Sequence, residues 1–531
     1  MNVVNPQLVV RFGSHSEKDY VLKMAKFLDG FMVAANLIES TPGATGSLLI
    51  KLSGPKHRLP FYVDPMTYGF AQPLELLKSE QKRKKKVVVD FKKSYKRLSE
   101  QFGGVFQEVI ENNKRLKLSE LKKDSNLREI VATTSRYQLN RIITEFENDP
   151  ELVGFAKDLA KPAAILTPYF LCRSSKISEW LNLIPRIAKS TVKLELGVPV
   201  HAVVCVEQEL LSDTSAQHDL IEGLNESGCA GVWLWFIGLN EHVVSTQVLT
   251  RLRNFVEELS KNLEVHNMHG GFFSLALSKY GLSSTAHGVG YGEQKDIAPI
   301  QGQAMPTVRY YLPATGRRLG VPSIERAFNE LDIHSAKDFH AKVCDCAICK
   351  GVVKHSLKEF SSFGDTRFAS PKSRRASQTP AAAKRCRFHF MINRVKEVKR
   401  VRDSSLKAII NALRDADNSW GVQPSLNSDS SYLARWIAAL SPTEPQDLED
   451  VADAIVEERI AKELKLSIEE FAELVWEVEH DESDDGVLYG YILTVSEGPE
   501  QTLAKLGIEE GDWISLPSWI FDDGHPDEDW D

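Results

Sequence analysis

Cysteine is scarce in this sequence, and long apolar runs are absent. Only 7 of the 531 residues are cysteine, too few for a disulfide-built extracellular scaffold and typical of a chain in a reducing cytosol. No run of about 18 apolar residues occurs, so no membrane-spanning helix is predicted. The first 15 residues lack the basic and apolar regions of a secretory signal. These absences favour a cytoplasmic protein with no membrane partner.

Basic residues are few at the end of the chain and abundant before it. Residues 441–531 hold 28 Asp and Glu against 4 Lys and Arg, whereas residues 1–440 hold 45 against 61. A basic body suits a polyanionic partner such as nucleic acid, and the acidic region suits a protein partner. The same charges also fit a solvated surface with an acidic, solubilising tail.

Short apolar segments rich in β-branched residues alternate with amphipathic ones. Such segments are typical of parallel strands that are buried on both faces. Eight candidates predict an α/β fold, a (β/α)₈ TIM barrel, although the sequence leaves open whether the first or the last of them belongs to the barrel. The candidates are Leu8–Phe12, Pro60–Val63, Ala163–Phe170, Val200–Val206, Gly231–Ile237, Leu263–Met268, Ser284–Val289 and Val308–Leu312.

The domain organisation follows from changes in composition along the chain. The barrel is expected over residues 1–340, interrupted at about 74–149 by a helical insertion that opens with the basic run Lys82–Lys86. A zinc-binding subdomain is expected over 341–416, including a basic loop at Ser370–Arg387. A small, acidic α+β domain and tail are expected over 417–531, with a helix at Leu448–Val478.

Three cysteines within six residues form the most informative motif, Cys344-Asp-Cys346-Ala-Ile-Cys349. Thiolates at this spacing can bind one tetrahedral ion, usually zinc. The fourth ligand must come from elsewhere, and His389 is preferred, with His340, His355 and Cys386 as competitors. Four protein ligands leave no open position, so the zinc is expected to be structural.

This motif resembles that of the tRNA-guanine transglycosylase superfamily, in which a His on a following helix closes the zinc site after the barrel. Three further segments, spread over about residues 55–400, are similar to that family. The segment ending in Asp64 resembles the strand that ends in its catalytic Asp, and Gln208 matches its base-reading Gln. Gly238 lies in a segment similar to its glycine-rich base pocket. The resemblance implies exchange of a guanine in nucleic acid, either tRNA or DNA, for a 7-deazaguanine base.

The sequence also departs from the family pattern. Asp64 is followed by Pro-Met-Thr where the family has Ser-Gly-Gly. No acid occurs within Ile165–Phe170, where the family reads guanine, and none occurs in the late strands that would carry its nucleophile. A distant branch, or a relative without the activity, fits these departures.

The residues themselves suggest which side chains do chemistry at the barrel mouth. A carboxylate closing an apolar strand, such as Asp64, can attack or stabilise C1′ of a nucleoside as the base departs. Glu207 is the preferred second acid, ahead of Glu293 and Asp296, and His287 is a further catalytic candidate. His269 and Gly270, which end another strand, suit contact with a base or phosphate. Asp64 equally fits a turn before Pro65, and the His residues equally fit packing roles.

Two other functions fit the same sequence. Asp64, His266, His269 and His287 could bind a catalytic metal, as in barrel hydrolases. The chain could instead be a non-catalytic protein that binds nucleic acid.

Overall fold

The computed structural model describes residues 4–83, 86–173, 177–290, 293, 307–368, 376–423, 425–426, 432–441, 459–482 and 488–517. The chain divides into two compact units, one of Met1–Glu241 with Thr250–Leu440, the other of His242–Leu249 with Ser441–Asp531. Asp296, part of the predicted basic loop, the start of the helix predicted from Leu448 and the acidic end of the chain lie outside the described residues. None of the described helices combines the length and apolarity that a membrane crossing requires.

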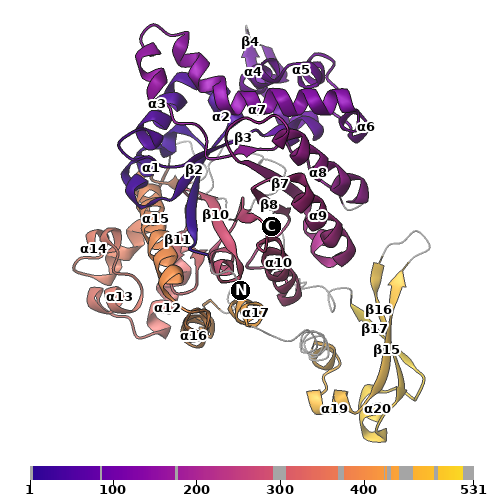
Figure 1. Ribbon diagram of the computed structural model, residues 1–531. Coiled ribbons are helices and arrows are strands. Elements are labelled where there is room, and N and C mark those ends of the chain that lie inside the picture. The colour runs from indigo at the N-terminus through magenta and orange to yellow at the C-terminus, as the bar shows by residue number, and fades with distance from the viewer. Residues whose placement is uncertain are drawn as a thin grey trace. The chain divides into compact units, whose positions relative to one another are not determined.

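The first unit is an α/β barrel whose eight strands are all parallel to their neighbours (Figure 1). The first and last barrel strands along the chain, β1 and β10, pair with each other. The remaining gap, between the third and fourth, is bridged where the N–H of Ala163 donates to the carbonyl of Phe61 at 2.8 Å. The barrel is therefore nearly closed. Its strands are β1 (Gln7–Phe12), β2 (Gly30–Ala34), β3 (Phe61–Asp64), β6 (Ile165–Leu166), β7 (Val200–Glu207), β8 (Gly231–Ile237), β9 (Glu264–Asn267) and β10 (Leu282–Gly288).

Seven of the eight predicted strands overlap barrel strands. The exception is Val308–Leu312, which becomes β11 (Tyr310–Leu312) and pairs antiparallel with β12 (Arg317–Leu319) outside the barrel. The barrel takes β2 instead, which the sequence analysis missed. This strand holds only five residues, Gly-Phe-Met-Val-Ala, and starts with a glycine, so its signal in the sequence is weak.

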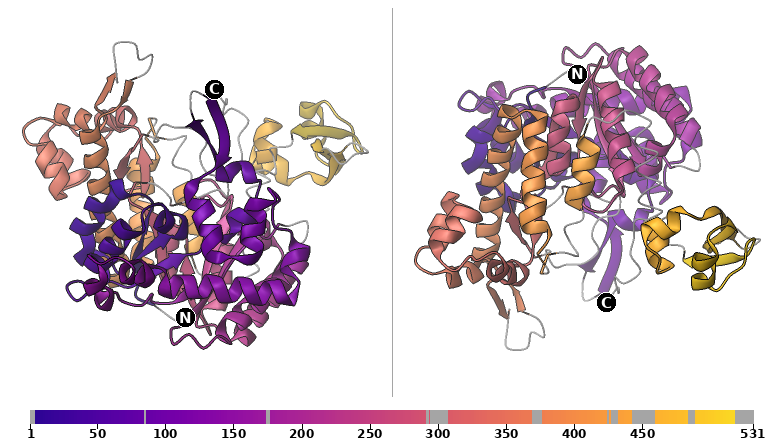
Figure 2. Two further views of the ribbon diagram at one scale, coloured as in Figure 1. Left: turned by 90° about the horizontal axis from the view of Figure 1, so that it is seen from above. Right: turned by 90° about the horizontal axis from the view of Figure 1, so that it is seen from below.

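Helices connect the strands and lie around the barrel, as the views in Figures 1 and 2 show. Local signals fix their ends. For example, the Asp213 side chain accepts the Ala216 N–H at 2.9 Å at the start of α9, and Gly228, with φ of 75°, ends this helix. The connecting helices are α1 (Lys18–Met24), α2 (Ala35–Ser40), α3 (Pro42–Ser53), α8 (Ile177–Val192), α9 (Thr214–Ser227), α10 (Thr246–Leu259) and α11 (Phe272–Ala276).

The insertion between β3 and β6 is helical, except at its beginning. The expectation that it opens with helix is wrong, because residues around the basic run form an antiparallel hairpin of β4 (Lys78–Arg83) and β5 (Lys86–Phe91). The segment Val87-Val88-Val89 has β-branched side chains that favour a strand over a helix. The helices that follow are α4 (Lys93–Phe102), α5 (Gly104–Glu111), α6 (Leu118–Leu121) and α7 (Asp124–Glu147).

After the barrel, the chain builds a second hydrophobic core from residues between Val308 and Leu426. The long helix α15 (Pro380–Asp403) begins with a Thr379 side-chain cap and a proline, both favourable at a helix start. Together with α16 (Leu406–Ala416) and α17 (Tyr432–Leu440), it covers one side of the barrel (Figure 2). The shorter elements here are α12 (Val321–Glu330), α13 (Ala336–Lys342), α14 (Ala347–Val352), β13 (Thr366–Phe368) and β14 (Ala376–Gln378).

The boundary of the first unit lies at Leu440, whereas the sequence places the start of the last domain at 417. The reason is α17, whose Trp436 donates to the Glu241 carbonyl at 2.6 Å and stacks on Phe272. The second unit contains an antiparallel sheet in the order β15-β16-β17 with its own apolar core. Its described elements are α19 (Ile468–Ala472), β15 (Val475–Glu482), β16 (Leu488–Glu497), α20 (Glu500–Leu506) and β17 (Trp513–Pro517).

Candidate metal centre and barrel mouth

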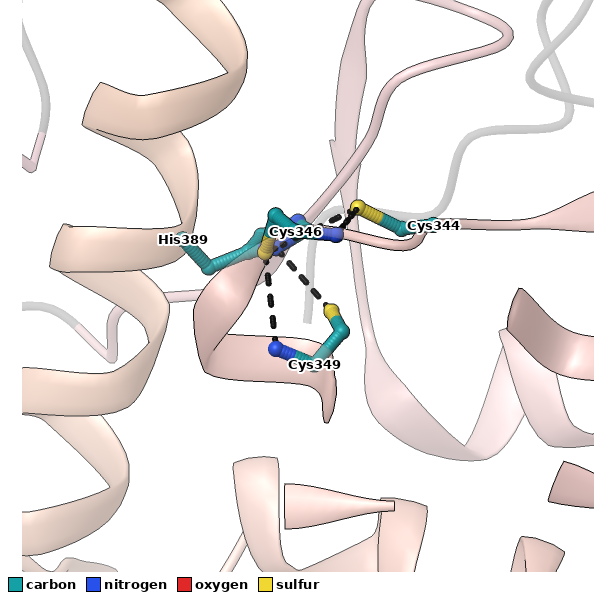
Figure 3. Close-up of side chains that lie close together, drawn as sticks. All are labelled: Cys344, Cys346, Cys349 and His389. Atoms are coloured by element: carbon teal, nitrogen blue, oxygen red, sulfur yellow. Dashed lines mark hydrogen bonds between the residues drawn. The ribbon is translucent and has the colours of Figure 1, made fainter. Parts of the chain in front are cut away.

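The three thiols and His389 meet in one buried cluster, shown in Figure 3. Cys346 is the N-cap residue of α14 and Cys349 lies within it, whereas His389 comes from the middle of α15. The Nδ1 atom of His389 lies 4.0 Å from Sγ of Cys344 and 3.3 Å from Sγ of both Cys346 and Cys349. These four side chains could hold a metal ion.

The imidazole of His389 is held so that one nitrogen faces the thiols. Its Nε2 donates to the backbone carbonyl of Tyr311 at 2.7 Å, and its ring stacks on Tyr310 with the centroids 4.1 Å apart. A metal-binding histidine usually donates its other ring N–H in this way, which fixes the tautomer and the direction of the free nitrogen. The Asn393 amide nitrogen lies 3.1 Å from Nδ1 on the same helix.

The competing ligands lie elsewhere. Both ring nitrogens of His340 face backbone carbonyls, those of Cys344 at 3.1 Å and Val353 at 2.7 Å. The Sγ of Cys386 donates to the Phe363 carbonyl, and His355 is exposed. Among the candidates weighed for the fourth position, His389 is therefore the one that the fold brings to the three cysteines.

The pKa values of the cluster's side chains are shifted by their contacts with one another. Burial acts to lower the pKa of His389, but hydrogen bonds and the charges of Cys344 and Cys346 outweigh it and raise the pKa to about 9. Hydrogen bonds from Cys344 and Cys349 lower the pKa of the Cys346 thiol. A divalent cation bound between these groups would take the thiolate and the neutral imidazole as ligands and release their protons.

Asp64 lies at the other candidate site, the C-terminal end of the barrel strands. It is the last residue of β3, and its side chain is fully buried. Its Oδ2 accepts from Arg11 of β1 at 2.7 Å, and its Oδ1 accepts from the Tyr169 hydroxyl at 2.8 Å and from the Met66 N–H at 3.0 Å. Asp64 therefore faces the barrel interior in an ion pair that the sequence analysis did not foresee.

Aromatic rings surround this ion pair. Tyr68 stacks on Tyr169 with the ring centroids 5.6 Å apart, and Trp235 of β8 meets the Tyr68 ring edge-on at 5.1 Å. Burial, followed by the Asp64 charge, raises the pKa of Tyr169 well above its usual value. The Tyr169 hydroxyl is therefore a firm hydrogen-bond donor to the carboxylate.

Glu207 and Gln208 lie at the same end of the barrel, where β7 ends. Glu207 is partly exposed, and its carboxylate lies 3.6 Å from Arg173. The Gln208 Oε1 is buried and has no hydrogen-bond partner among the described residues. Gly238, at φ of 83°, lies next to it, since a Cβ there would come within 3.9 Å of the Gln208 amide carbon.

His269 and Gly270 follow β9. The His269 ring contacts Trp235 at 5.1 Å, which places it beside the aromatic group around Asp64. A Cβ on Gly270 would lie 2.3 Å from the Thr285 hydroxyl, so only glycine fits. Next to them, the buried Glu241 carboxylate accepts the N–H groups of Gly271 and Phe273 at 2.9 and 3.1 Å.

His287 points away from these residues. It is buried against Phe390 of α15, with the ring centroids 5.0 Å apart, outside the barrel. The alternation along β10 explains this, because the neighbouring Ala286 belongs to the interior cluster. Burial, followed by the charge of Arg394, lowers the pKa of His287 to about 3. The other alternative acid, Glu293, pairs with Arg394 at 2.6 Å.

A second group of metal-binding residue types was missed by the sequence analysis. It consists of His201, Glu264 and His266, whose ligand atoms lie within 4.8 Å of one another. Glu264 and His266 are two residues apart on β9, the spacing that puts both side chains on one face of a strand, and this was the available signal. Within the described residues, neither potential metal cluster includes Asp64 or His287.

Comparison of the chain with models of known protein families finds no match. Comparison with curated proteins finds none either.

Proposed function

We propose that this protein is a base-exchange transglycosylase that replaces a guanine in nucleic acid, tRNA or DNA, with a 7-deazaguanine derivative. The reaction takes place at the C-terminal end of the barrel, with Asp64 as the central group. The observation that carries the proposal is the ion pair at 2.7 Å between the fully buried Asp64 and Arg11, which is 13% exposed. It lies at the end of the strands where barrel enzymes do their chemistry.

A buried ion pair at this place needs a reason other than stability. Removing two charges from water costs several kcal/mol per ion, which their attraction often does not recover. An apolar pair would fill the same space at lower cost. Arg11 keeps an acceptor oxygen of Asp64 fixed in an otherwise apolar interior, as preorganised catalytic groups require.

In the proposed first step, an Asp64 oxygen forms a bond to C1′ while the bond between C1′ and N9 of guanine breaks. Glu207 gives a proton to the departing base. The incoming base then loses its N9 proton to Glu207, its N9 bonds to C1′, and the bond to Asp64 breaks. Asp64 has no exposed surface, so the substrate must displace the tyrosines over it, Tyr68 and Tyr169.

Base recognition falls to residues around the same end of the barrel. The unpartnered Gln208 Oε1 can accept from a base edge, and Gly238 leaves room beside it. His269 and Gly270 form the other border of the proposed base-binding site. His287 has no part in the proposed reaction, because it packs against Phe390 instead of facing the interior.

The Cys344, Cys346, Cys349 and His389 cluster is proposed to bind a structural Zn²⁺. Four protein ligands complete a tetrahedral site and leave no position for a substrate. The ion would fix α14 to α15 and, through the bond from His389 to Tyr311, to β11.

Nucleic acid is proposed to bind across the basic surfaces of the first unit. These are the insertion with its basic run Lys82–Lys86, and the basic segment Ser370–Arg387. The acidic region from Asp481 onward is proposed to compete for them, or to bind a protein partner.

The test is to incubate the full-length protein with labelled guanine and either tRNA or DNA, and to measure label in the polymer. Incorporation into one of them supports the proposal. Absence of incorporation into both, with a folded, metal-loaded protein, rejects it.

A further inference from the structure

His201, Glu264 and His266 lie at the opposite end of the barrel from Asp64. His201 is the second residue of β7, and Glu264 and His266 are the first and third residues of β9. The strand between them, β8, starts at the same level, because Gly231 pairs with His201 on one side and with Glu264 on the other.

Glycine at 231 makes room for this group. Its backbone has no unusual φ, so the reason is space. A Cβ there would lie 3.1 Å from the His201 Nε2 and 2.8 Å from the Glu264 carbonyl oxygen. A side chain at this position of β8 would therefore crowd both the His201 imidazole and the Glu264 backbone.

The ring of His266 is oriented as a ligand would be. Its Nδ1 lies 2.8 Å from the Ser284 hydroxyl, and its ring stacks on Trp233 with the centroids 4.6 Å apart. Its Nε2 is buried and makes no hydrogen bond within the described part of the chain. An unpaired buried nitrogen costs about 1–3 kcal/mol, so its retention needs an explanation.

The carboxylate of Glu264 completes the group. Its Oε2 lies 3.7 Å from Nε2 of His266 and 3.9 Å from Nε2 of His201. Ligands bound at about 2.0–2.2 Å to one tetrahedral zinc lie roughly 3.4 Å apart. The Glu264 side chain is 66% exposed and can turn, so small side-chain movements suffice to close the site.

We propose that His201, Glu264 and His266 bind a divalent transition metal ion such as Zn²⁺, at a second site separate from the Cys344–His389 cluster. Two imidazoles and one carboxylate suit zinc and leave one position for water. The ion would link β7 to β9 across Gly231, and it would be accessible to solvent beside Glu264. Since the N-terminal end of such barrels serves stability, its effect is to stabilise the barrel.

The test compares Zn²⁺ binding to the full-length protein and to Glu264→Gln, by competition with a chromophoric chelator. Because Glu264 is exposed, this variant keeps the fold. The wild type should bind one Zn²⁺ more than the variant does at the same free concentration. The affinity at this site should fall roughly a hundredfold, since loss of an outer-shell partner alone costs about 10- to 100-fold. Glu258→Gln, an acid of α10 whose side chain is 50% exposed, is the matched control and should bind as the wild type does.

Gly231→Ala provides a second test, because its Cβ would press on His201 and should also weaken this Zn²⁺ site. Equal stoichiometry and affinity in the wild type and Glu264→Gln would overturn the proposal. So would wild-type protein that binds no Zn²⁺ beyond the ion of the cysteine cluster. Neither result depends on the transglycosylase activity.

Discussion

The cysteine cluster and the barrel mouth were both singled out from the sequence, yet they differ in what holds them together. In the cluster, Nδ1 of His389 lies 3.3–4.0 Å from the sulfur atoms of the three thiols. At the mouth, the Asp64 carboxylate already has an arginine, a tyrosine and a backbone N–H as partners. The first site could hold an ion that joins its members, whereas the second is complete within the protein.

This difference predicts different results when each site is disrupted. Loss of one cysteine ligand should release the metal and the elements it joins. Loss of the Asp64 charge should leave Arg11, which is only 13% exposed, without its partner and remove the proposed chemistry. The predictions below test this contrast, from the largest expected effect to the smallest.

Cys349→Ser should abolish metal binding at the cysteine cluster and lower the free energy of unfolding by several kcal/mol. Structural zinc supplies about 10–16 kcal/mol in zinc-finger peptides, so the loss of a ligand removes folding free energy directly. Metal content and thermal unfolding measure both effects. Cys386→Ser is the matched control, since this buried thiol donates to Phe363 and lies outside the cluster. Equal metal loss in both variants would contradict the assignment of the ligands.

Asp64→Asn should destabilise the protein by about 3 kcal/mol, because removing one member of a buried ion pair leaves the other charge uncompensated. The double variant Arg11→Met/Asp64→Asn should recover much of this stability, as measured by denaturant unfolding. If the single variant is as stable as the wild type, Arg11 and Asp64 are not the coupled pair that the geometry implies.

Acid should weaken the packing between the barrel and α15 through His287. Its pKa is about 3 in the folded state, against about 6.5 unfolded, so below pH 6.5 the unfolded chain binds more protons and stability falls. One such group contributes about 1.4 kcal/mol per pH unit between these values. His287→Phe should reduce the slope of unfolding free energy between pH 6.5 and 5 by this amount. His334→Gln, an exposed histidine, should leave the slope unchanged.

Replacing Lys82–Lys86 with glutamine should have the smallest effect, a modest weakening of nucleic-acid binding. Each lost phosphate contact should reduce the slope of log K against log salt by about 0.9 on duplex DNA, or about 0.7 on single strands. Binding measured at several salt concentrations gives this slope. An unchanged slope would mean that the hairpin makes no phosphate contacts.

The two sites also show which functional residues can be predicted from the sequence and which cannot. The cysteines are neighbours in the chain, so their spacing alone predicts a shared ion. His389 could be chosen because it follows the basic loop, whose closure can return it to the thiols. Asp64 could be placed at a strand end, because an acid that closes an apolar run is visible in the sequence. Its partner Arg11 lies 53 residues earlier and two strands away in the barrel, so only the strand order brings the two together.

Other features depended on distinctions that the sequence does not carry. An apolar run such as Val308–Leu312 has the same pattern in a barrel strand and in a hairpin outside it. The direction of His287 depends on which residues of β10 face inward, and one residue of register reverses this. His201 and His266 meet only because β7 and β9 flank β8.

The most direct test of the proposed function compares guanine exchange by the wild type, the Arg11→Met/Asp64→Asn double variant and Arg11→Met alone, with equal amounts of folded protein. The account predicts exchange into tRNA or DNA by the wild type, and none by the double variant at unchanged metal content. Arg11→Met should retain part of the activity, since it keeps the Asp64 carboxylate. Equal exchange by the wild type and the double variant would contradict the role of Asp64, and no exchange by the wild type on either polymer would contradict the function itself.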